Sequence, residues 1–148
     1  MTAAQRDIQT TDDLVILVVR VAKAMVDRLR AESPDGQSSP LTVVHGLAAR
    51  YLIGRDNVTT AEIARYLRIT KQSASEVIAL LEQTGTVVRV RHPHDGRARI
   101  VLLTEVGRAK LDQGRERWQR VEDEWRALVG DRNLAIVRDA LETYLASN

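Results

Sequence analysis

A short segment that has the pattern of a β-hairpin contains four arginines: Arg89, Arg91, Arg97 and Arg99. Residues 86–91 alternate, with Val88 and Val90 on one strand face and arginines on the other. A second β-branched and apolar run follows at 99–103, after a proline that cannot donate to a strand ladder and an Asp-Gly pair that tolerates positive φ. Guanidinium groups at this density can bind phosphate. An edge strand that carries charge to prevent aggregation explains them equally well.

The segment before the hairpin has the pattern of a helix-turn-helix. Thr59 and Glu62 fit a capping box at the start of a helix of about two turns. After a turn at Arg68-Ile69, Thr70 can cap a second helix, which Gly85 ends. The apolar residues of this second helix recur at helical spacing and are Ala74, Val77, Ile78 and Leu81. Two short helices in close contact are typical of this motif.

The opposite face of the second helix carries short or hydrogen-bonding side chains, which can enter a DNA major groove without a clash. The candidate contacts are Thr70, Lys71, Gln72, Ser73, Ser75 and Glu76. Residues 65–99 carry 7 basic and 3 acidic side chains, whereas the whole chain has a net charge of only +2. Because phosphate contacts require such a local excess of positive charge, the helix and the hairpin together predict DNA binding.

The order and spacing of these elements resemble the MarR family, the winged-helix regulators named after multiple-antibiotic resistance. The resemblance covers nearly the whole chain in length and helix order. The family's wing signature, D-x-R with L-T-x-x-G after it, is similar to Asp95-Gly96-Arg97-Ala98-Arg99 followed by Val101-Leu102-Leu103-Thr104 and Gly107. The resemblance implies a mainly α fold with a small β-hairpin wing, in which a winged helix-turn-helix domain is joined to terminal dimerisation helices.

Two parts are therefore expected. Residues 40–104 would form the winged helix-turn-helix DNA-binding domain, with the helix-turn-helix at about 60–84 and the wing at about 86–103. Residues 1–32 and 105–148 would form a helical dimerisation region.

Capping residues and apolar periodicity predict the helices outside the helix-turn-helix. The first covers 14–31, where Asp12-Asp13 can cap it, and the second runs from 40 to about 53, with Ser39 as cap and Pro40 in the first helical position. A third begins after its cap Thr104 and runs from 105 to about 129, and a last helix starts at Asp131. An apolar helix at each end of a small domain needs a partner surface, which favours a homodimer. Packing within the chain is the alternative.

Two residues depart from the family pattern. Arg68 stands in a turn where members often have glycine, and positive φ there would cost a non-glycine residue free energy. Glu76 stands where members often have an arginine that reaches DNA. A carboxylate repels phosphate, so Glu76 either accepts from cytosine N4 or pairs with a neighbouring cation. Base preference is therefore not transferred from relatives.

The resemblance also implies a mode of binding. A homodimer would read a pseudopalindrome with two recognition helices in consecutive major grooves, roughly 10 base pairs apart. The expected wing contacts are Arg89, Arg91, His94, Asp95, Arg97 and Arg99. In this scheme Arg97 enters the minor groove and Asp95 braces the turn or orients that arginine. The other arginines touch phosphate or only keep the strands soluble, and protonation of His92 and His94 would add positive charge beside DNA.

Family members are commonly regulated by a small, often phenolic or anionic, ligand that enters a crevice between the dimer helices and the winged helix and releases DNA. The residues that could line such a crevice are His45, Arg50, Tyr51 and Tyr66. Ordinary packing or solvent exposure is the simpler explanation for each of them.

Composition excludes several other classes. With no cysteine there is no disulfide, thiolate metal site or cysteine switch, and with no long apolar segment and charges near the N-terminus a cytoplasmic protein without a membrane span is expected. His92, His94 and Asp95 lack a fourth zinc ligand nearby, so no metal is expected. An enzyme is not expected either, because a nucleophile elbow, a phosphate-binding glycine loop and HExxH are all absent, and no cofactor is implied.

A different class of function competes with the DNA-binding regulator. A winged helix can serve as a protein-interaction or anti-regulatory module without sequence-specific DNA binding, and Glu76 motivates this alternative. Salt dependence separates the two, because only a DNA reader loses affinity steeply between about 50 and 200 mM salt.

Overall fold

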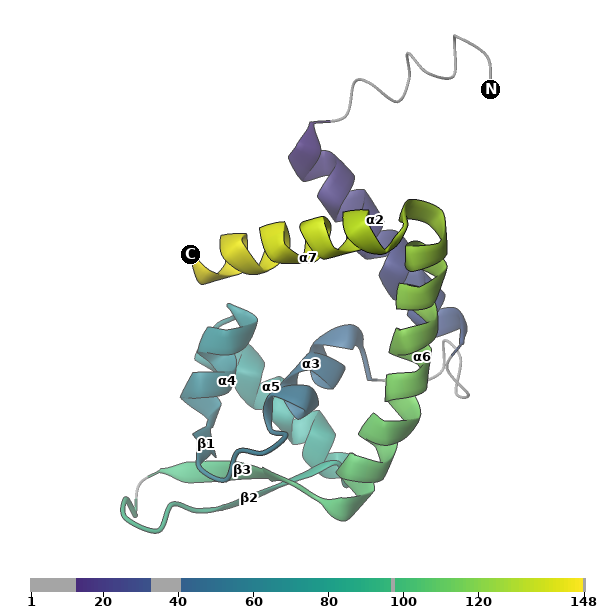
Figure 1. Ribbon diagram of the computed structural model, residues 1–148. Helices are drawn as coiled ribbons and strands as arrows, with labels where there is room; N and C mark the ends of the chain where they lie inside the picture. The colour runs from purple at the N-terminus through teal and green to yellow at the C-terminus, as the bar shows by residue number, and fades with distance from the viewer. Residues whose placement is uncertain (1–12, 33–40, 97, 148) are drawn as a thin grey trace, which may run out of the picture. The chain divides into compact units, whose positions relative to one another are not determined.

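The computed structural model describes residues 13–32, 41–96 and 98–147 (Figure 1). The helices are α2 (Leu14–Ala31), α3 (Val43–Tyr51), α4 (Thr60–Leu67), α5 (Lys71–Gln83), α6 (Glu105–Val129) and α7 (Asp131–Ala146). The strands are β1 (Val58–Thr59), β2 (Val87–Arg91) and β3 (Arg99–Leu103). Two compact units result: a winged-helix unit, Ser38–Trp118, and a helical unit formed by 1–37 and 119–148. The expected boundary at 104/105 falls at the start of α6, whereas the units divide inside that helix.

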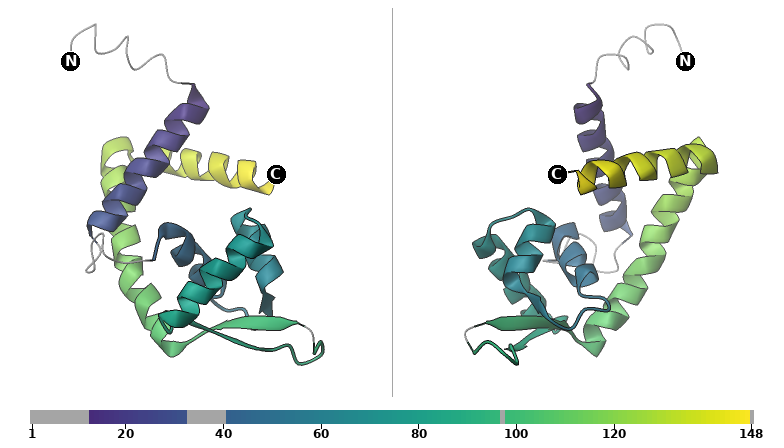
Figure 2. Two further views of the ribbon diagram at one scale, coloured as in Figure 1. Left: turned by 180° about the vertical axis from the view of Figure 1, so that it is seen from behind. Right: turned by 60° about the vertical axis from the view of Figure 1, so that its left-hand side comes forward.

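The winged-helix unit contains a three-stranded antiparallel sheet with the order β1-β3-β2. Strands β2 and β3 pair from Val87 with Leu103 to Arg91 with Arg99, and form a hairpin that extends beyond the helices of the unit (Figure 2). The mainly α fold with a hairpin wing is confirmed. The third strand was not predicted from the sequence, because β1 has only two residues and exists only through its pairing with β3.

The core of this unit is aliphatic. Its largest fully buried side chains are Ile63 of α4, Ile78 and Leu81 of α5, and Val101 of β3. Ala48 and Leu52, in and just after α3, pack against the same cluster. Burial of a side chain of this size contributes about 1.5–3 kcal/mol to the free energy of unfolding. The apolar faces of α3, α4 and α5 are therefore held against the sheet.

Local capping begins both helices of the helix-turn-helix as predicted. Glu62 Oε2 accepts from the Thr59 N–H at 2.7 Å, and Thr59 Oγ1 accepts from the Glu62 N–H at 3.3 Å. Thr70 Oγ1 accepts from the Ser73 N–H at 3.1 Å. Arg68 ends α4 in the left-handed conformation with φ 56° and ψ 42°, which confirms the strained position expected in this turn.

The start of α3 differs from the prediction. Leu41 and Thr42 are not helical, and the helix runs from Val43 to Tyr51, whereas a helix from 40 to about 53 was expected. The physical reason is that His45 Nδ1 accepts from the Thr42 N–H at 3.1 Å, which satisfies a backbone donor at Thr42. Ser39 and Pro40, the expected cap, lie outside the described residues.

The helical unit buries little apolar surface. Helix α2 has no buried residue, and Leu134 of α7 is the one buried hydrophobic residue among those described in this unit. Asp13 precedes α2 without the side-chain cap that was predicted, and Asp12 is not among the described residues. Within the described residues, no helix combines the length and the hydrophobicity needed to cross a bilayer.

Ionic contacts connect the helices of this unit instead. Arg28 of α2 donates to Glu124 of α6 at 2.6 Å, and Arg120 of α6 contacts Glu32 at 2.9 Å. Glu122 of α6 accepts from Arg138 of α7 at 2.8 Å. Exposed ion pairs are screened by water and contribute little free energy, so they orient these helices more than they stabilise them.

Gly107 has the least room for a side chain among the described glycines. A Cβ atom there would lie 2.1 Å from the Thr86 carbonyl oxygen and 2.9 Å from a Leu103 side-chain carbon. The hydroxyl of Thr104 donates to the Gly85 carbonyl at 2.6 Å and accepts from the Gly107 N–H at 2.9 Å. The L-T-x-x-G part of the wing signature therefore has a structural role. It holds the connection between β3 and α6 against the connection between α5 and β2.

We expect Gly107→Ala to lower the free energy of unfolding by about 3 kcal/mol, because the backbone of Thr86 must move away from the added methyl group. Gly46→Ala is the matched control: Gly46 lies in α3, and no atom of the described residues lies within 4 Å of its Cβ position, so alanine should raise stability by roughly 0.5–1 kcal/mol. Urea unfolding followed by circular dichroism measures both. Equal stabilities of the two variants would contradict the close contact.

Candidate nucleic-acid interface

The first turns of α5 present the predicted recognition residues on one face. Lys71, Gln72 and Glu76 are exposed, Ser73 and Ser75 are half-buried, and Ala74 faces the core. The Thr70 hydroxyl caps the helix and donates to Ser73 Oγ at 2.9 Å, so these two hydroxyls are partly committed to each other. Lys71, Gln72 and Glu76 are consequently the side chains best placed to meet a ligand outside the protein.

Glu76 has a weak partner on its own helix. Gln72 Nε2 donates to Glu76 Oε1 at 3.5 Å, the upper limit for such a bond. Across the described ranges, no ion pair to Glu76 is found, so its pairing with a neighbouring cation is not observed there. The Gln72–Glu76 pair offers one amide and one carboxylate side by side, which can donate to and accept from base edges.

The outer end of the wing carries two opposed arginines. Arg91 and Arg99 are directly paired across the strands, and both are exposed. Like charges in this position repel, which weakens the hairpin unless an anion lies close by. At the turn, the His94 N–H donates to His92 Nδ1 at 3.2 Å and the Asp95 carbonyl accepts from the Ala98 N–H at 3.1 Å. Arg97, the expected minor-groove residue, lies outside the described residues.

Arg89 differs from the other wing arginines. Its partner across the strands is the fully buried Val101, and its side chain is only 22% exposed, whereas Val88 on the other face is 42% exposed. The Arg89 side chain approaches Glu82 and the Ser75 carbonyl of α5. Alternation in the sequence separated the two faces correctly, but it did not indicate that the arginine face is turned toward the helix at this position.

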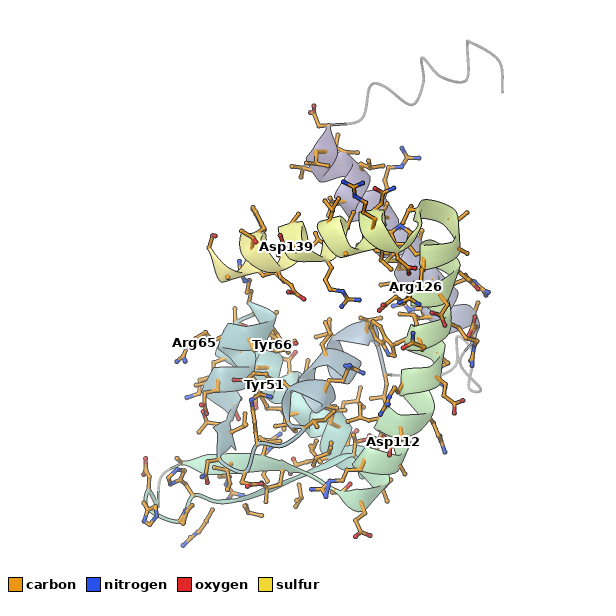
Figure 3. The ribbon with its side chains drawn as sticks, in the orientation of Figure 1. Tyr51, Arg65, Tyr66, Asp112, Arg126 and Asp139 are labelled. Atoms are coloured by element: carbon orange, nitrogen blue, oxygen red, sulfur yellow. The ribbon has the colours of Figure 1, made fainter. Side chains whose placement is uncertain are left out.

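Two of the four predicted ligand-binding residues come together. Tyr51 of α3 and Tyr66 of α4 stack with ring centroids 4.4 Å apart and planes at 22° (Figure 3). Arg55 adds a third layer, since its guanidinium lies 4.4 Å from the Tyr51 ring and donates to the Tyr51 carbonyl at 2.7 Å. Arg55 was not predicted from the sequence, because it lies beyond the end of α3 and after Gly54, where helical spacing no longer applies.

His45 and Arg50 make other contacts. His45 Nδ1 accepts from the Thr42 backbone, and burial lowers the pKa of its imidazole. The Arg50 guanidinium lies 5.9 Å from the Trp118 ring. The stacked tyrosines are therefore the part of the predicted set that the fold gathers into one cluster.

A model of the MarR family matches residues 39–98, the segment that contains the helix-turn-helix and most of the wing. Over these residues the chain is similar to the MarR family of transcriptional regulators. An HTH-type transcriptional regulator of Mycobacterium tuberculosis is 29% identical over 140 residues, which cover 95% of this chain and 93% of that protein. The transcriptional activatory protein BadR of Rhodopseudomonas palustris is 29% identical over 79 residues, covering 53% and 45% of the two chains.

Solved structures of transcriptional regulators share this fold. The transcriptional repressor CouR, bound to a 23-mer DNA duplex, is 27% identical with a TM-score of 0.75, and 94% of each chain is covered. BldR from Sulfolobus solfataricus is 18% identical with a TM-score of 0.77 over 100% of both chains, which shows the shared fold. The MarR resemblance seen in the wing signature is thus confirmed.

The lowered pKa of His45 gives the winged-helix unit a pH-dependent stability. Because burial lowers the pKa of folded His45 below its usual 6.5, the unfolded chain takes up a proton that the folded chain does not. The free energy of unfolding should therefore fall as the pH drops below about 6.5. His45→Gln removes this titration.

We expect the stability difference between pH 7.5 and pH 5.5 to be smaller in His45→Gln than in the wild type, measured by urea unfolding at constant ionic strength. His94→Gln is the control, since His94 is exposed and lies in the wing turn, and it should keep the wild-type dependence. Identical pH profiles for wild type and His45→Gln would contradict the role of the buried imidazole.

Proposed function

We propose that this MarR-family chain is a repressor that binds a pseudopalindromic operator as a homodimer, with α5 in the major groove and the wing over the adjacent backbone and minor groove. The observation that carries the proposal is the pairing of an exposed polar face on α5 with an exposed, opposed pair of arginines on the wing. Arg91 and Arg99 repel each other in the free protein, and a phosphate backbone between or beside them would offset that repulsion. The similarity to the repressor CouR, which has been solved bound to a 23-mer DNA duplex, supports DNA binding.

The homodimer is supported by the surface of α2. This helix has no buried residue, and its first turns expose Leu14, Val15 and Val19 by 74%, 74% and 63%. Leu128 and Tyr144 in the same unit are also largely exposed. Exposure of this much apolar surface to water is unfavourable, so we propose that it is buried against the helical unit of a second copy of the chain. Two-fold symmetry then places two α5 helices roughly 10 base pairs apart.

A small planar effector is part of the proposal. CouR has also been solved with p-coumaroyl-CoA, a ligand that contains a phenolic ring. The stack of Arg55, Tyr51 and Tyr66 leaves Tyr66 47% exposed, so a planar or anionic molecule could extend it. Release of DNA requires that such a ligand bind one conformation of the protein more tightly than the other.

Selection of bound sequences from a random duplex pool tests the DNA-binding function. An enriched pseudopalindrome with half-sites about 10 base pairs apart is expected. Binding to that duplex should weaken steeply with salt. Enrichment of no sequence, together with binding that does not respond to salt, would favour the protein-interaction module that Glu76 raises as the alternative.

The two opposed arginines should contribute to this salt dependence. We expect Arg91→Ala and Arg99→Ala each to lower the slope of log K against log salt by about 0.9 per monomer, the value for one phosphate contact. Arg132→Ala, an exposed arginine on α7, is the control for loss of one positive charge and should leave the slope unchanged. Fluorescence anisotropy on the selected duplex measures the slopes, and unaltered slopes in both wing variants would reject the phosphate contacts.

Charges placed on α2 test the dimer. We expect Val15→Glu with Val19→Glu to convert the dimer to monomers, because each carboxylate would have to be desolvated in the interface. Ala109→Glu, on an exposed position of α6 in the winged-helix unit, is the control and should stay dimeric. Sedimentation velocity gives the masses. A dimer that persists in the α2 variant would place the interface elsewhere.

A further inference from the structure

Glu82, near the end of α5, connects the recognition helix to the wing. Its Oε1 atom accepts from the Arg89 N–H at 3.0 Å, and its Oε2 atom lies 2.9 Å from Arg89 Nε. Arg89 Nη2 donates in turn to the Ser75 carbonyl at 3.3 Å, one turn into the same helix. We refer to Glu82, Arg89 and the Ser75 carbonyl as the Glu82–Arg89 brace.

The brace acts at the open edge of the sheet. Strand β2 is the outer strand in the order β1-β3-β2, and the Arg89 N–H bonds to a side chain of α5 instead of to β3. A carboxylate that accepts this N–H satisfies a donor at the edge of the sheet and opposes sliding of the strand along the helix. The same carboxylate holds the guanidinium that reaches Ser75, so a backbone bond and an ion pair act together.

The two charges are partly withdrawn from water. The Arg89 and Glu82 side chains are 22% and 35% exposed, and Arg89 Nε is buried with no hydrogen-bond partner among the described residues. Its contact with Glu82 is therefore a close charge–charge contact and not a hydrogen bond. Removal of either charge would leave the other poorly solvated, which makes the pair interdependent.

We propose that the Glu82–Arg89 brace positions the wing relative to the recognition helix and thereby sets the affinity for DNA, although neither side chain touches DNA. The inference rests on the proposed function. Ser75 belongs to the turn of α5 that carries Gln72 and Glu76, so Arg89 connects the wing strand directly to the turn that would face the bases. Major-groove and wing contacts can form together only if the spacing between them is held, because a misplaced contact contributes little.

The direction in which Glu82→Gln changes the affinity for DNA distinguishes this positioning role from simple charge repulsion. Loss of a carboxylate near DNA normally strengthens binding, because repulsion of phosphate is removed. The brace predicts the opposite for Glu82→Gln, which should bind the selected duplex about tenfold more weakly, corresponding to about 1.4 kcal/mol. Arg89→Gln should weaken binding similarly without changing the salt slope, and the double variant should be no weaker than the weaker single variant.

Asp112→Asn is the matched control. Asp112 is an exposed acid on the part of α6 that belongs to the winged-helix unit (Figure 3), and its loss changes the net charge by the same amount as Glu82→Gln. We expect it to bind the duplex as tightly as the wild type or more tightly. Arg89→Lys keeps the positive charge but loses the Nη2 bond to the Ser75 carbonyl, so its affinity should fall between those of wild type and Arg89→Gln.

Amide hydrogen exchange in the free protein supplies a readout that needs no DNA. The Arg89 amide should exchange faster in Glu82→Gln than in wild type or Asp112→Asn, while core amides such as that of Ile78 stay protected. If Glu82→Gln does not fold, Arg89→Lys carries the test.

Three results would overturn the brace: a Glu82→Gln protein that binds as tightly as Asp112→Asn, an Arg89→Gln protein whose salt slope falls by about 0.9, or unchanged exchange at the Arg89 amide. The second result would make Arg89 a phosphate contact. If the wild type selects no duplex, the proposed function fails, and the exchange measurement alone decides whether the brace exists.

Discussion

The winged-helix unit depends on the backbone contact between Gly107 and Thr86. At this point the end of α5, the start of β2, the end of β3 and the start of α6 meet, and no side-chain carbon fits between the two backbones. The Thr104 hydroxyl bridges the same junction, and Lys110 of α6 donates to the Thr84 carbonyl at 2.8 Å. Since the inner end of the wing is held in this way, its outer end can move relative to α5 only if the hairpin bends or slides.

The Glu82–Arg89 brace acts on that remaining freedom. It lies midway along β2, between the junction at Thr86 and the exposed arginines at the outer end of the strand. The order along the wing is therefore a backbone junction, then a partly buried ion pair, then exposed cations. Rigid elements support the side chains that would meet DNA, which is a common requirement of precise binding sites.

The helical unit follows a different physical rule. It has almost no core of its own in the described residues, and its helices are related by exposed ion pairs such as Arg28 with Glu124. The hydrogen bond to Glu124 raises the pKa of Arg28, and the same bond lowers the pKa of Glu124, so both stay charged over the physiological range. Such pairs give orientation but little free energy, and the apolar surface of α2 must find its stabilisation elsewhere.

Short-range chemistry was readable from the residues alone. The capping box of Thr59 and Glu62, the left-handed turn at Arg68, the bounds of α2 and the MarR wing signature could all be predicted from the residues, because each depends on positions close together in the chain. The pairing of β1 with β3, the stacking of Tyr51 on Tyr66, and the orientation of Arg89 toward Glu82 became visible in the folded molecule alone, because each joins separate elements of the fold. The four wing arginines look alike along the chain. They differ because strand register places one of them beside a helix, and register is set by the burial of distant residues such as Val101.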